Sequence, residues 1–414
     1  MKKLLCLVSI LAFITFFTEC SAQGMLGKLK DKVKQKTQQR VEQNEDKAID
    51  KGLDKVDPSK TNNSSNKDNA SNTNADNSGV VDNNTAGKNQ PAVPTLHTYQ
   101  NYDFVPGDTI LFADDFTSDQ DGEFPAHWDL DKGQGAVNKV LGIPAMTLTE
   151  GNYARISPLM KTKSYLTDPF TIECDYMVNN GGAYGINIFL KGPGDKEGHI
   201  NYNEHGNVSS AYFQKDFSAD YPDHAAKDDE FYNKWHHIAI IYKNHQIKCY
   251  LDQYRVLVMP NVDFVPISIQ IGGIGDQEKP IVFTNLRVAS GGNMNMIGQK
   301  FTESKIVTHG INFDIDKATI KPESMGTLNM IVNILKNNPE VKFEIDGHTD
   351  NSGAAQHNLD LSQQRADAVK MQLVNMGIDA SRLTTKGFGD TKPISDNSTM
   401  EGKANNRRVE FVKM

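Results

Sequence analysis

The residues best suited to chemistry lie in two neighbouring segments near the carboxyl end of the chain. Gly347-His348-Thr349-Asp350 places a carboxylate in a predicted loop, and Arg365 follows Asp350 by 15 positions on a predicted helix. At about 100° per residue, Arg365 falls in the same sector as the apolar residues Leu361 and Val369. A guanidinium on an apolar face needs an anionic partner, because burying an unpaired charge is costly.

Three interpretations of Arg365 are open. The side chain could snorkel out to solvent, or it could form an internal pair with Asp350 that ties the helix to the loop. It could also lie at the rim of a site where the carboxylate of a ligand completes the pair. An acid and a base held apart in this way would suit a small zwitterion.

The surrounding pattern predicts the elements that position these residues. Helical spacing covers residues 323–336, after Pro322, and residues 361–376, where Gly377 ends the helix. Strands are predicted at 341–345, 382–387 and 408–412. Helices that alternate with strands indicate a two-layer α/β unit.

The stretch from about residue 305 to the end resembles the OmpA-like peptidoglycan-binding domain, and we place this domain at residues 301–414. Four ordered motifs carry the resemblance: Ile311-Asn312-Phe313-Asp314, Gly347-His348-Thr349-Asp350, Leu361-Ser362 to Arg365-Ala366, and Asn406-Arg407-Arg408-Val409-Glu410. The resemblance implies non-covalent binding of peptidoglycan through the meso-diaminopimelate of its stem peptide. It implies a binding protein rather than an enzyme, with no cofactor and no metal.

The resemblance also implies roles for individual residues. Asp350 matches the aspartate that accepts hydrogen bonds from the diaminopimelate ammonium, and Arg365 matches the arginine that pairs with the carboxylate. Asn358 and Asp314 match secondary polar positions of the same pocket. Arg407 is a further candidate for ligand contact, with the anchoring of a loop as the alternative.

Residues 103–290 are predicted to be all-β, because their apolar runs have strand length and are separated by glycine and asparagine. The strings Trp235-His236-His237 and Asp114-Asp115-Phe116 resemble laminin-G and concanavalin-like jelly rolls. The fold class is therefore multidomain, with a jelly-roll sandwich before the α/β domain. Glu173 and Asp175 share one strand face, but Val178 stands where a third acid would complete a glycanase motif, so hydrolysis is not predicted.

A glycan bound at the sandwich is the alternative function. In that case the protein would be a glycan-recognition or carbohydrate-active protein that the C-terminal domain only localises. Cys174 and Cys249 lie in predicted strands, and either a disulfide or two buried thiols fits them.

The first 22 residues have the anatomy of a signal peptide, with Lys2 and Lys3 before an apolar run and small residues ahead of Gln23. Lipidation of Cys20 is a second possibility. Residues 23–57 form a basic amphipathic pattern, which could lie on the outer membrane surface, pair with a partner helix or serve as a solvated stalk.

Residues 58–95 are predicted to be a disordered linker, because the stretch from Thr61 to Gln90 has ten asparagines, four serines and no aromatic residue. With 414 residues and a net charge of −8, the chain has room for two or three domains and shows no bias toward nucleic acid. These features predict an exported protein in the periplasm or at the outer membrane of a Gram-negative bacterium.

Overall fold

The structure is a computed structural model that describes residues 99, 102–177, 185–203, 205–221, 231–275, 277–292 and 301–414, without the side chains of residues 150–153. The predicted signal peptide, basic helix and linker lie outside these residues. By its contacts the chain divides into two units, Met1–Lys88 and Asn89–Met414, and every described residue belongs to the second. Within the described ranges, no helix combines the length and the apolar character that a membrane crossing requires.

Residues 102–292, here called the β region, contain strands that join into one 13-stranded sheet among the described residues. Its strands are β1 (Thr109–Asp114), β2 (Trp128–Val140), β3 (Ile143–Pro158), β4 (Phe170–Met177), β5 (Ile186–Lys191), β6 (Glu197–Tyr202), β7 (Val208–Ala211), β8 (Ser218–Ala219), β9 (Trp235–Lys243), β10 (Gln246–Leu251), β11 (Tyr254–Met259), β12 (Ser268–Gly273) and β13 (Ile281–Ser290).

Strand β3 explains why the strands form one continuous sheet. Its first half pairs with β13, where Leu148 lies opposite Ile281, and its second half pairs with β12, where Ile156 lies opposite Ile271. The partner strand β2 shows three register shifts along the same stretch. A long strand that bends in this way can pass from one layer of strands to another.

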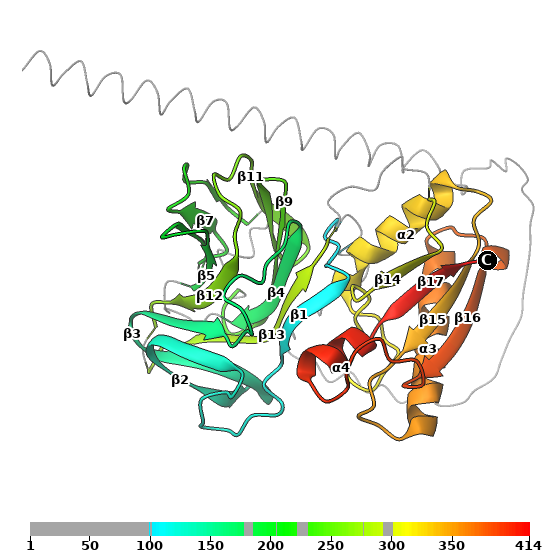
Figure 1. Cartoon of the computed structure of the whole chain (residues 1–414), viewed down its shortest axis with the longest axis horizontal. Helices are drawn as coiled ribbons and strands as arrows, with labels where there is room; N and C mark the ends of the chain where they lie inside the picture. Colours follow the sequence, from blue (N-terminus) through cyan, green and yellow to red (C-terminus); the bar gives the residue numbers. More distant parts are fainter. Residues whose placement is uncertain are drawn as a thin grey trace, which may run out of the picture. The chain divides into compact units, whose positions relative to one another are not determined.

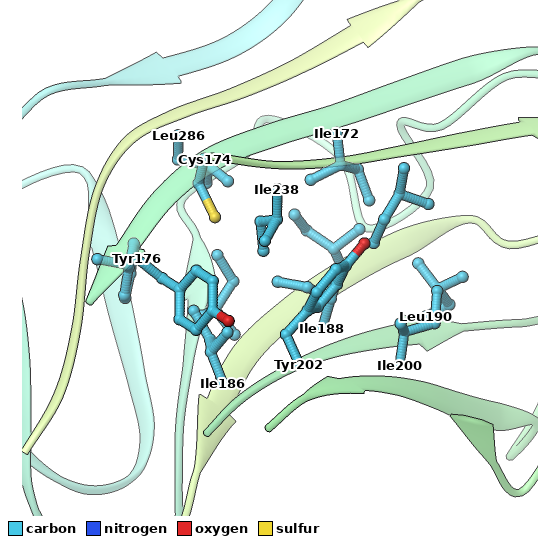
Figure 2. Packing of buried hydrophobic residues seen from close by; sticks show 14 of the residues in the cluster. Ile172, Cys174, Tyr176, Ile186, Ile188, Leu190, Ile200, Tyr202, Ile238 and Leu286 are labelled. Carbon is cyan, nitrogen blue, oxygen red and sulfur yellow. The ribbon is translucent and has the colours of Figure 1, made fainter. Parts of the chain in front are cut away.

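The core of the β region lies between facing layers of strands. Figure 2 shows Cys174 and Tyr176 of β4 pointing toward Ile186 and Ile188 of β5, with Tyr202 of β6 beside them. These side chains are all almost fully buried. Alternation of inward apolar residues along each strand therefore produced this core.

Two of the three predictions for this region are confirmed. Cys174 and Cys249 are both free and buried, so the interpretation as buried thiols is confirmed and the disulfide is excluded for this structure. A large β-rich region before the C-terminal domain is confirmed. The specific likeness to laminin-G or concanavalin-like jelly rolls stays a prediction.

Residues 301–414, here called the C-terminal region, form a four-stranded sheet that shares an apolar cluster with its two longest helices (Figure 1). The elements are β14 (Lys305–Thr308), the 3-10 turn η2 (Pro322–Ser324), α2 (Met325–Asn337), β15 (Phe343–His348), α3 (Ala355–Asn375), η3 (Ala380–Arg382), β16 (Leu383–Gly389), α4 (Met400–Asn406) and β17 (Val409–Lys413). The strand order is β14-β17-β15-β16, and only the pair β15-β16 is parallel. The expected two-layer α/β unit is present.

The second predicted helix begins earlier than expected. Helix α3 starts at Ala355 rather than at Leu361, although Gly377 ends it with a φ of 92°, as predicted. Its first six residues, Ala-Gln-His-Asn-Leu-Asp, are mostly exposed and therefore lack an apolar period from which the helix could be predicted. As a consequence, Asn358 lies in the second turn of the helix.

The β region and the C-terminal region share buried surface. One apolar cluster joins Tyr102, Phe104 and Tyr250 to Leu328 of α2 and other core residues of the C-terminal region. Asn405 exchanges two hydrogen bonds with the backbone of Ile110, both 2.9 Å long. The two regions therefore pack as parts of one unit.

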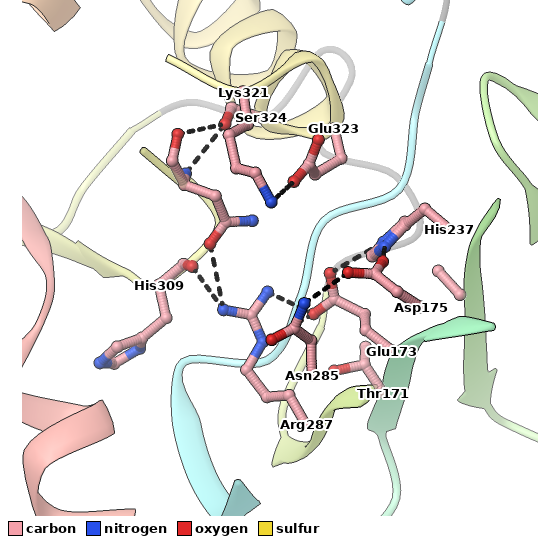
Figure 3. Close-up of polar contacts among 12 residues, drawn as sticks. Thr171, Glu173, Asp175, His237, Asn285, Arg287, His309, Lys321, Glu323 and Ser324 are labelled. Atoms are coloured by element: carbon pink, nitrogen blue, oxygen red, sulfur yellow. Dashed lines mark hydrogen bonds and ion pairs between the residues drawn. The ribbon is translucent and has the colours of Figure 1, made fainter. Parts of the chain in front are cut away.

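A buried ionic cluster lies at the same contact (Figure 3). The Nε atom of Arg287 donates to Glu173 Oε2 over 2.8 Å, and its Nη1 atom donates to the His309 carbonyl over 2.9 Å. His237 donates to Asp175 over 2.8 Å. Burial alone would lower the pKa of His237, but the hydrogen bond to Asp175 and the nearby Glu173 carboxylate outweigh burial and raise the pKa to about 10. The Glu173 and Asp175 carboxylates are thus engaged by Arg287 and His237, and Arg287 carries the connection to the C-terminal region.

Candidate ligand-binding site

The carboxylate of the site stands on the loop that follows β15. The first loop residues are fixed by the neighbouring strands, because Thr349 N donates to the Gly389 carbonyl over 2.9 Å. The Oδ1 atom of Asp350 then accepts a hydrogen bond of 2.8 Å from the Ser352 backbone. This turn, typical of aspartate, holds the Asp350 side chain in a defined position.

Asn358 holds the same loop from the side of α3. Its Nδ2 atom donates to the carbonyls of Asp350, at 3.2 Å, and Gly353, at 3.3 Å. A Cβ atom on Gly353 would lie 2.6 Å from Asn358 Oδ1, so this contact requires glycine or a displaced amide. Asn358 is buried, so its amide supports the loop from the core side.

Asp350 is paired with Arg407, not with Arg365. Arg407 Nη1 lies 2.6 Å from Asp350 Oδ2, and the exposed fractions of the two side chains are 48% and 10%. Burial alone would raise the pKa of Asp350, but the hydrogen bonds from Arg407 and Ser352 outweigh it and hold the pKa below its usual value. The internal pair considered for Arg365 is therefore wrong, and Arg407 takes that place.

Arg365 points to the loop that follows Phe313. Its Nε atom donates to the Lys317 carbonyl over 2.9 Å, and Nη2 reaches the Asp314 carbonyl at 3.5 Å. The guanidinium carbon lies 4.9 Å from the centre of the Phe313 ring. Within the part of the chain that the structure describes, Arg365 forms no ion pair, so its charge meets carbonyl dipoles and a ring face.

Asp314 takes part through its backbone. Its carbonyl accepts hydrogen bonds from the Lys317 backbone and from Arg365. The same loop is tied to α3 by His357, whose Nε2 atom lies 2.5 Å from Asp316 Oδ1. The first turns of α3 and the loop at 313–317 thus form one wall beside Arg365.

Arg365 differs from Arg407 in having no ion-pair partner of its own among the described residues. Asp350 is paired with Arg407, and the charges of Arg407, Asp316 and Asp350 all influence the pKa of Arg365. Burial and the charge of Arg407 lower this pKa, while Asp316 and Asp350 partly offset the effect. The Arg365 guanidinium therefore bonds to backbone carbonyls and leaves donors without a carboxylate partner among the described residues. Such a site favours an anionic group, and an arginine fork can bind a carboxylate through two hydrogen bonds.

All five residues singled out from the sequence belong to this arrangement. Asp350, Arg407 and Asn358 meet at the loop after β15, while Arg365 and Asp314 meet at the loop after Phe313. Sequence reasoning missed Phe313 as a ring beneath Arg365 and Ser352 as a donor to Asp350. The signal for Phe313 was present, because it lies beside Asp314 in the first motif.

Among the described residues, one other cluster, of two carboxylates and a histidine, could offer ligand atoms to a metal ion. Ligand atoms of Asp346, His348 and Glu410, all buried, lie within 4.8 Å of one another. However, Glu410 Oε1 accepts from Arg408 over 2.7 Å and Oε2 from Lys305 over 2.9 Å. Because both oxygens already face cations, we assign no metal to this group.

Comparison with known proteins gives a family for the C-terminal region. Residues 312–407 match the OmpA family. The probable lipoprotein YiaD of Escherichia coli strain K12 is 46% identical over 104 residues, which are 25% of this chain and 48% of that protein. The peptidoglycan-binding protein ArfA of Mycobacterium bovis is 42% identical over 107 residues, 26% of this chain and 33% of that protein. This chain therefore spans less than half the length of either relative.

A match to a solved structure also covers only about a quarter of this chain. The cell wall anchor of the T6SS from Pseudomonas aeruginosa is 31% identical, with a TM-score of 0.25, and the match covers 27% of this chain and 80% of that one.

Proposed function

Since residues 312–407 of this chain are a domain of the OmpA family, we propose that the protein binds peptidoglycan non-covalently and tethers part of the cell envelope to the wall. The support comes from the match itself and from a relative that is named as a peptidoglycan-binding protein. The observation that carries the proposal beyond the family is the positive charge of Arg365, which has no carboxylate partner among the described residues.

The proposed ligand is the meso-diaminopimelate of the stem peptide. Its free end carries a carboxylate and an ammonium on one carbon, which complement a guanidinium and a carboxylate held a short distance apart. The ligand carboxylate pairs with Arg365, and the ammonium hydrogen-bonds Asp350 beside Arg407. Asn358 and Asp314 act by holding the two loops, through the hydrogen bonds described above.

We propose an exported protein with the boundaries inferred from the sequence. A signal peptide (1–22), a basic helix at the outer membrane surface (23–57) and a linker (58–95) precede the β domain (103–290) and the wall-binding domain (301–414). Relatives named as a lipoprotein and as outer membrane porin F support a place in the envelope.

A titration with two stem peptides tests the ligand. One peptide contains diaminopimelate and the other contains lysine, which lacks the second carboxylate. Loss of a charge-assisted hydrogen-bonded pair costs about 1.5 to 3 kcal/mol, so the mature chain should prefer the first peptide by more than about 10-fold. Arg365→Ala should abolish this preference, whereas Lys370→Ala, which removes a charge from the same helix, should retain it.

Sedimentation with isolated sacculi tests the wall attachment itself. The mature chain should co-sediment, and Asp350→Ala and Arg365→Ala should each leave a much larger share of the protein in the supernatant. Equal affinity of the wild-type chain for the two peptides would refute the role of diaminopimelate. Co-sedimentation of both variants to the same extent as the wild type would refute the site.

A further inference from the structure

The β region carries a polar surface of its own, on the outer side of strands β3, β12, β5 and β6. Side chains alternate along these strands, so Ile188 and Ile200 point into the core while Phe189 and His199 point outward. Phe189 lies between Gln270 of β12 and His199 of β6 in the register of the sheet. We call Arg155, Phe189, Glu197, His199, Tyr212 and Gln270 the polar sheet face.

Planar polar side chains are held in fixed positions on the polar sheet face. Arg155 forms a two-pronged pair with Glu197, at 2.9 Å and 3.0 Å, and also reaches Gln270 Oε1 at 3.3 Å. Lys191 approaches the same glutamate at 2.6 Å. Gln270 Nε2 in turn donates to Asp131 over 3.0 Å. The side chains of Arg155 and Glu197 remain 26% and 20% exposed, so their outer edges can reach a ligand.

A row of rings adjoins these polar groups and ends in an exposed tyrosine. Arg155 stacks over Phe189 at 3.8 Å, and the ring centres of Phe189 and His199 lie 5.3 Å apart. The Tyr212 ring packs edge-on against His199, also at 5.3 Å, yet Tyr212 is 75% exposed. Its φ of 64° is unfavourable for a tyrosine. The chain thus holds a large ring at the surface, although burial of this ring contributes little to the stability of the fold.

The charges on this surface nearly cancel. Arg155 and Lys191 oppose Glu197 and Asp131. Burial lowers the pKa of His199, the charge of Glu197 offsets part of this effect, and the charge of Arg155 adds to it, so that the imidazole is neutral. A balanced surface does not select a polyanion or a polycation. It suits a neutral ligand with many hydrogen-bonding groups and an apolar ring face, which is the chemistry of a saccharide.

We propose that the polar sheet face binds the glycan strand of peptidoglycan, with one sugar stacked on Tyr212 and its hydroxyl or acetamido groups bonded to Arg155, Glu197 and Gln270. The choice of this glycan rests on the proposed function of the C-terminal region. The β region and the C-terminal region share a buried cluster, so a stem peptide and a glycan of one polymer can be bound by a single folded unit. The second contact would raise the overall affinity through effective concentration.

The test uses two probes that separate the two sites. Glycan strands freed of stem peptides by an amidase report on the polar sheet face, once the muramic acid carboxylates that the cleavage exposes are converted to methyl amides so that the strands are neutral. The diaminopimelate peptide reports on the C-terminal region. The mature chain should bind the bare strands, and Tyr212→Ala should weaken this binding by about 5- to 10-fold through loss of the stacked ring. Tyr212→Phe should retain it. Asp350→Ala should bind bare strands as the wild type does.

Leu141→Ala is the matched control, because Leu141 is also an apolar residue, 70% exposed, with a φ of 51°. It should leave both affinities unchanged. Wild-type protein that binds the stem peptide but not the bare strands would overturn this proposal and leave the wall-binding function intact. Equal weakening by Tyr212→Ala and Leu141→Ala, or preferential binding of cello-oligosaccharides, would also overturn it.

Discussion

At the scale of single residues, neighbouring groups shift the pKa values of two aspartates of the C-terminal region in opposite directions. Burial and the charges of Glu344 and Glu410 raise the pKa of Asp346 to about 6. Hydrogen bonds from Arg407 and Ser352 outweigh the burial of Asp350 and lower its pKa. The folded protein therefore favours the neutral form of Asp346 and the charged form of Asp350.

This difference gives a pH-dependent prediction for Asp346→Asn. A folded-state pKa of about 6, above the usual 3.8, means that the stability Asp346 contributes is complete below pH 3.8 and is lost as the pH rises through 6. Asparagine mimics the neutral form, so the variant should be more stable than wild type at pH 7.5, by about 1 to 2 kcal/mol. Urea unfolding between pH 4 and 8 measures the gain, which should vanish near pH 4.

Asp350→Asn is the control with the opposite sign. Because the pKa of Asp350 is lowered, its contribution is present at neutral pH and is lost as the pH falls. The variant should be less stable than wild type at pH 7.5 and should approach it in acid. A stability gain for Asp346→Asn that does not change with pH would contradict the assigned cause.

At the scale of elements, helix α2 packs closely against the segment that precedes β1, at Tyr102 and Phe104. Gly326 lies so close to Phe104 that an added Cβ atom would be 1.8 Å from the Phe104 carbonyl oxygen. Asn329, one turn further along, donates to the Tyr102 carbonyl over 3.2 Å. The segment therefore lies between strand β10, through Tyr250, and the start of α2.

The change in stability caused by Gly326→Ala shows whether helix propensity or packing dominates at this position. Propensity alone predicts a gain of about 1 kcal/mol, because alanine is the better helix former. The contact with Phe104 predicts instead a net loss on the order of 1 to 2 kcal/mol, because backbone must move to make room. Urea unfolding decides the sign. Lys336→Ala, at an exposed position of the same helix, should change the stability little, and a more stable Gly326→Ala protein would refute the close packing.

At the scale of the whole described molecule, the ionic cluster makes the two regions depend on each other. Glu173 is almost fully buried and relies on Arg287, and Arg287 also reaches the backbone of His309 in the C-terminal region. Burial alone would raise the pKa of Glu173, but Arg287 and His237 lower it, so the carboxylate is charged. Removing the arginine would leave a buried charge without its main partner.

Arg287→Met should therefore destabilise both regions together, by about 3 kcal/mol. Calorimetry should show one unfolding transition in the wild type and one at lower temperature in the variant. Adding Glu173→Gln should recover part of the loss, because the unpaired charge is gone. Lys196→Met, which breaks an exposed pair of 3.9 Å with Asp263, should cost less than about 0.5 kcal/mol. Separate transitions, with only the β region affected, would refute the coupling.

The sequence by itself determined the features that depend on local pattern. Apolar runs of strand length predicted the strands around Cys174 and Cys249, and helical spacing with Gly377 predicted the end of α3. The motifs that contain Asp350 and Arg365 predicted the family of the C-terminal region. These inferences succeed because side-chain period and turn chemistry act over a few residues.

Only the tertiary structure decided which charges meet. Arg407 lies 57 positions from Asp350, and Arg287 lies 114 positions from Glu173, so neither pair leaves a trace in local spacing. The polar sheet face likewise brings Tyr212 beside His199 and Phe189 only once the strands are in register. A Coulomb interaction or a ring contact depends on distance in space, and the path of the chain between two residues fixes that distance only when the whole sheet is assembled.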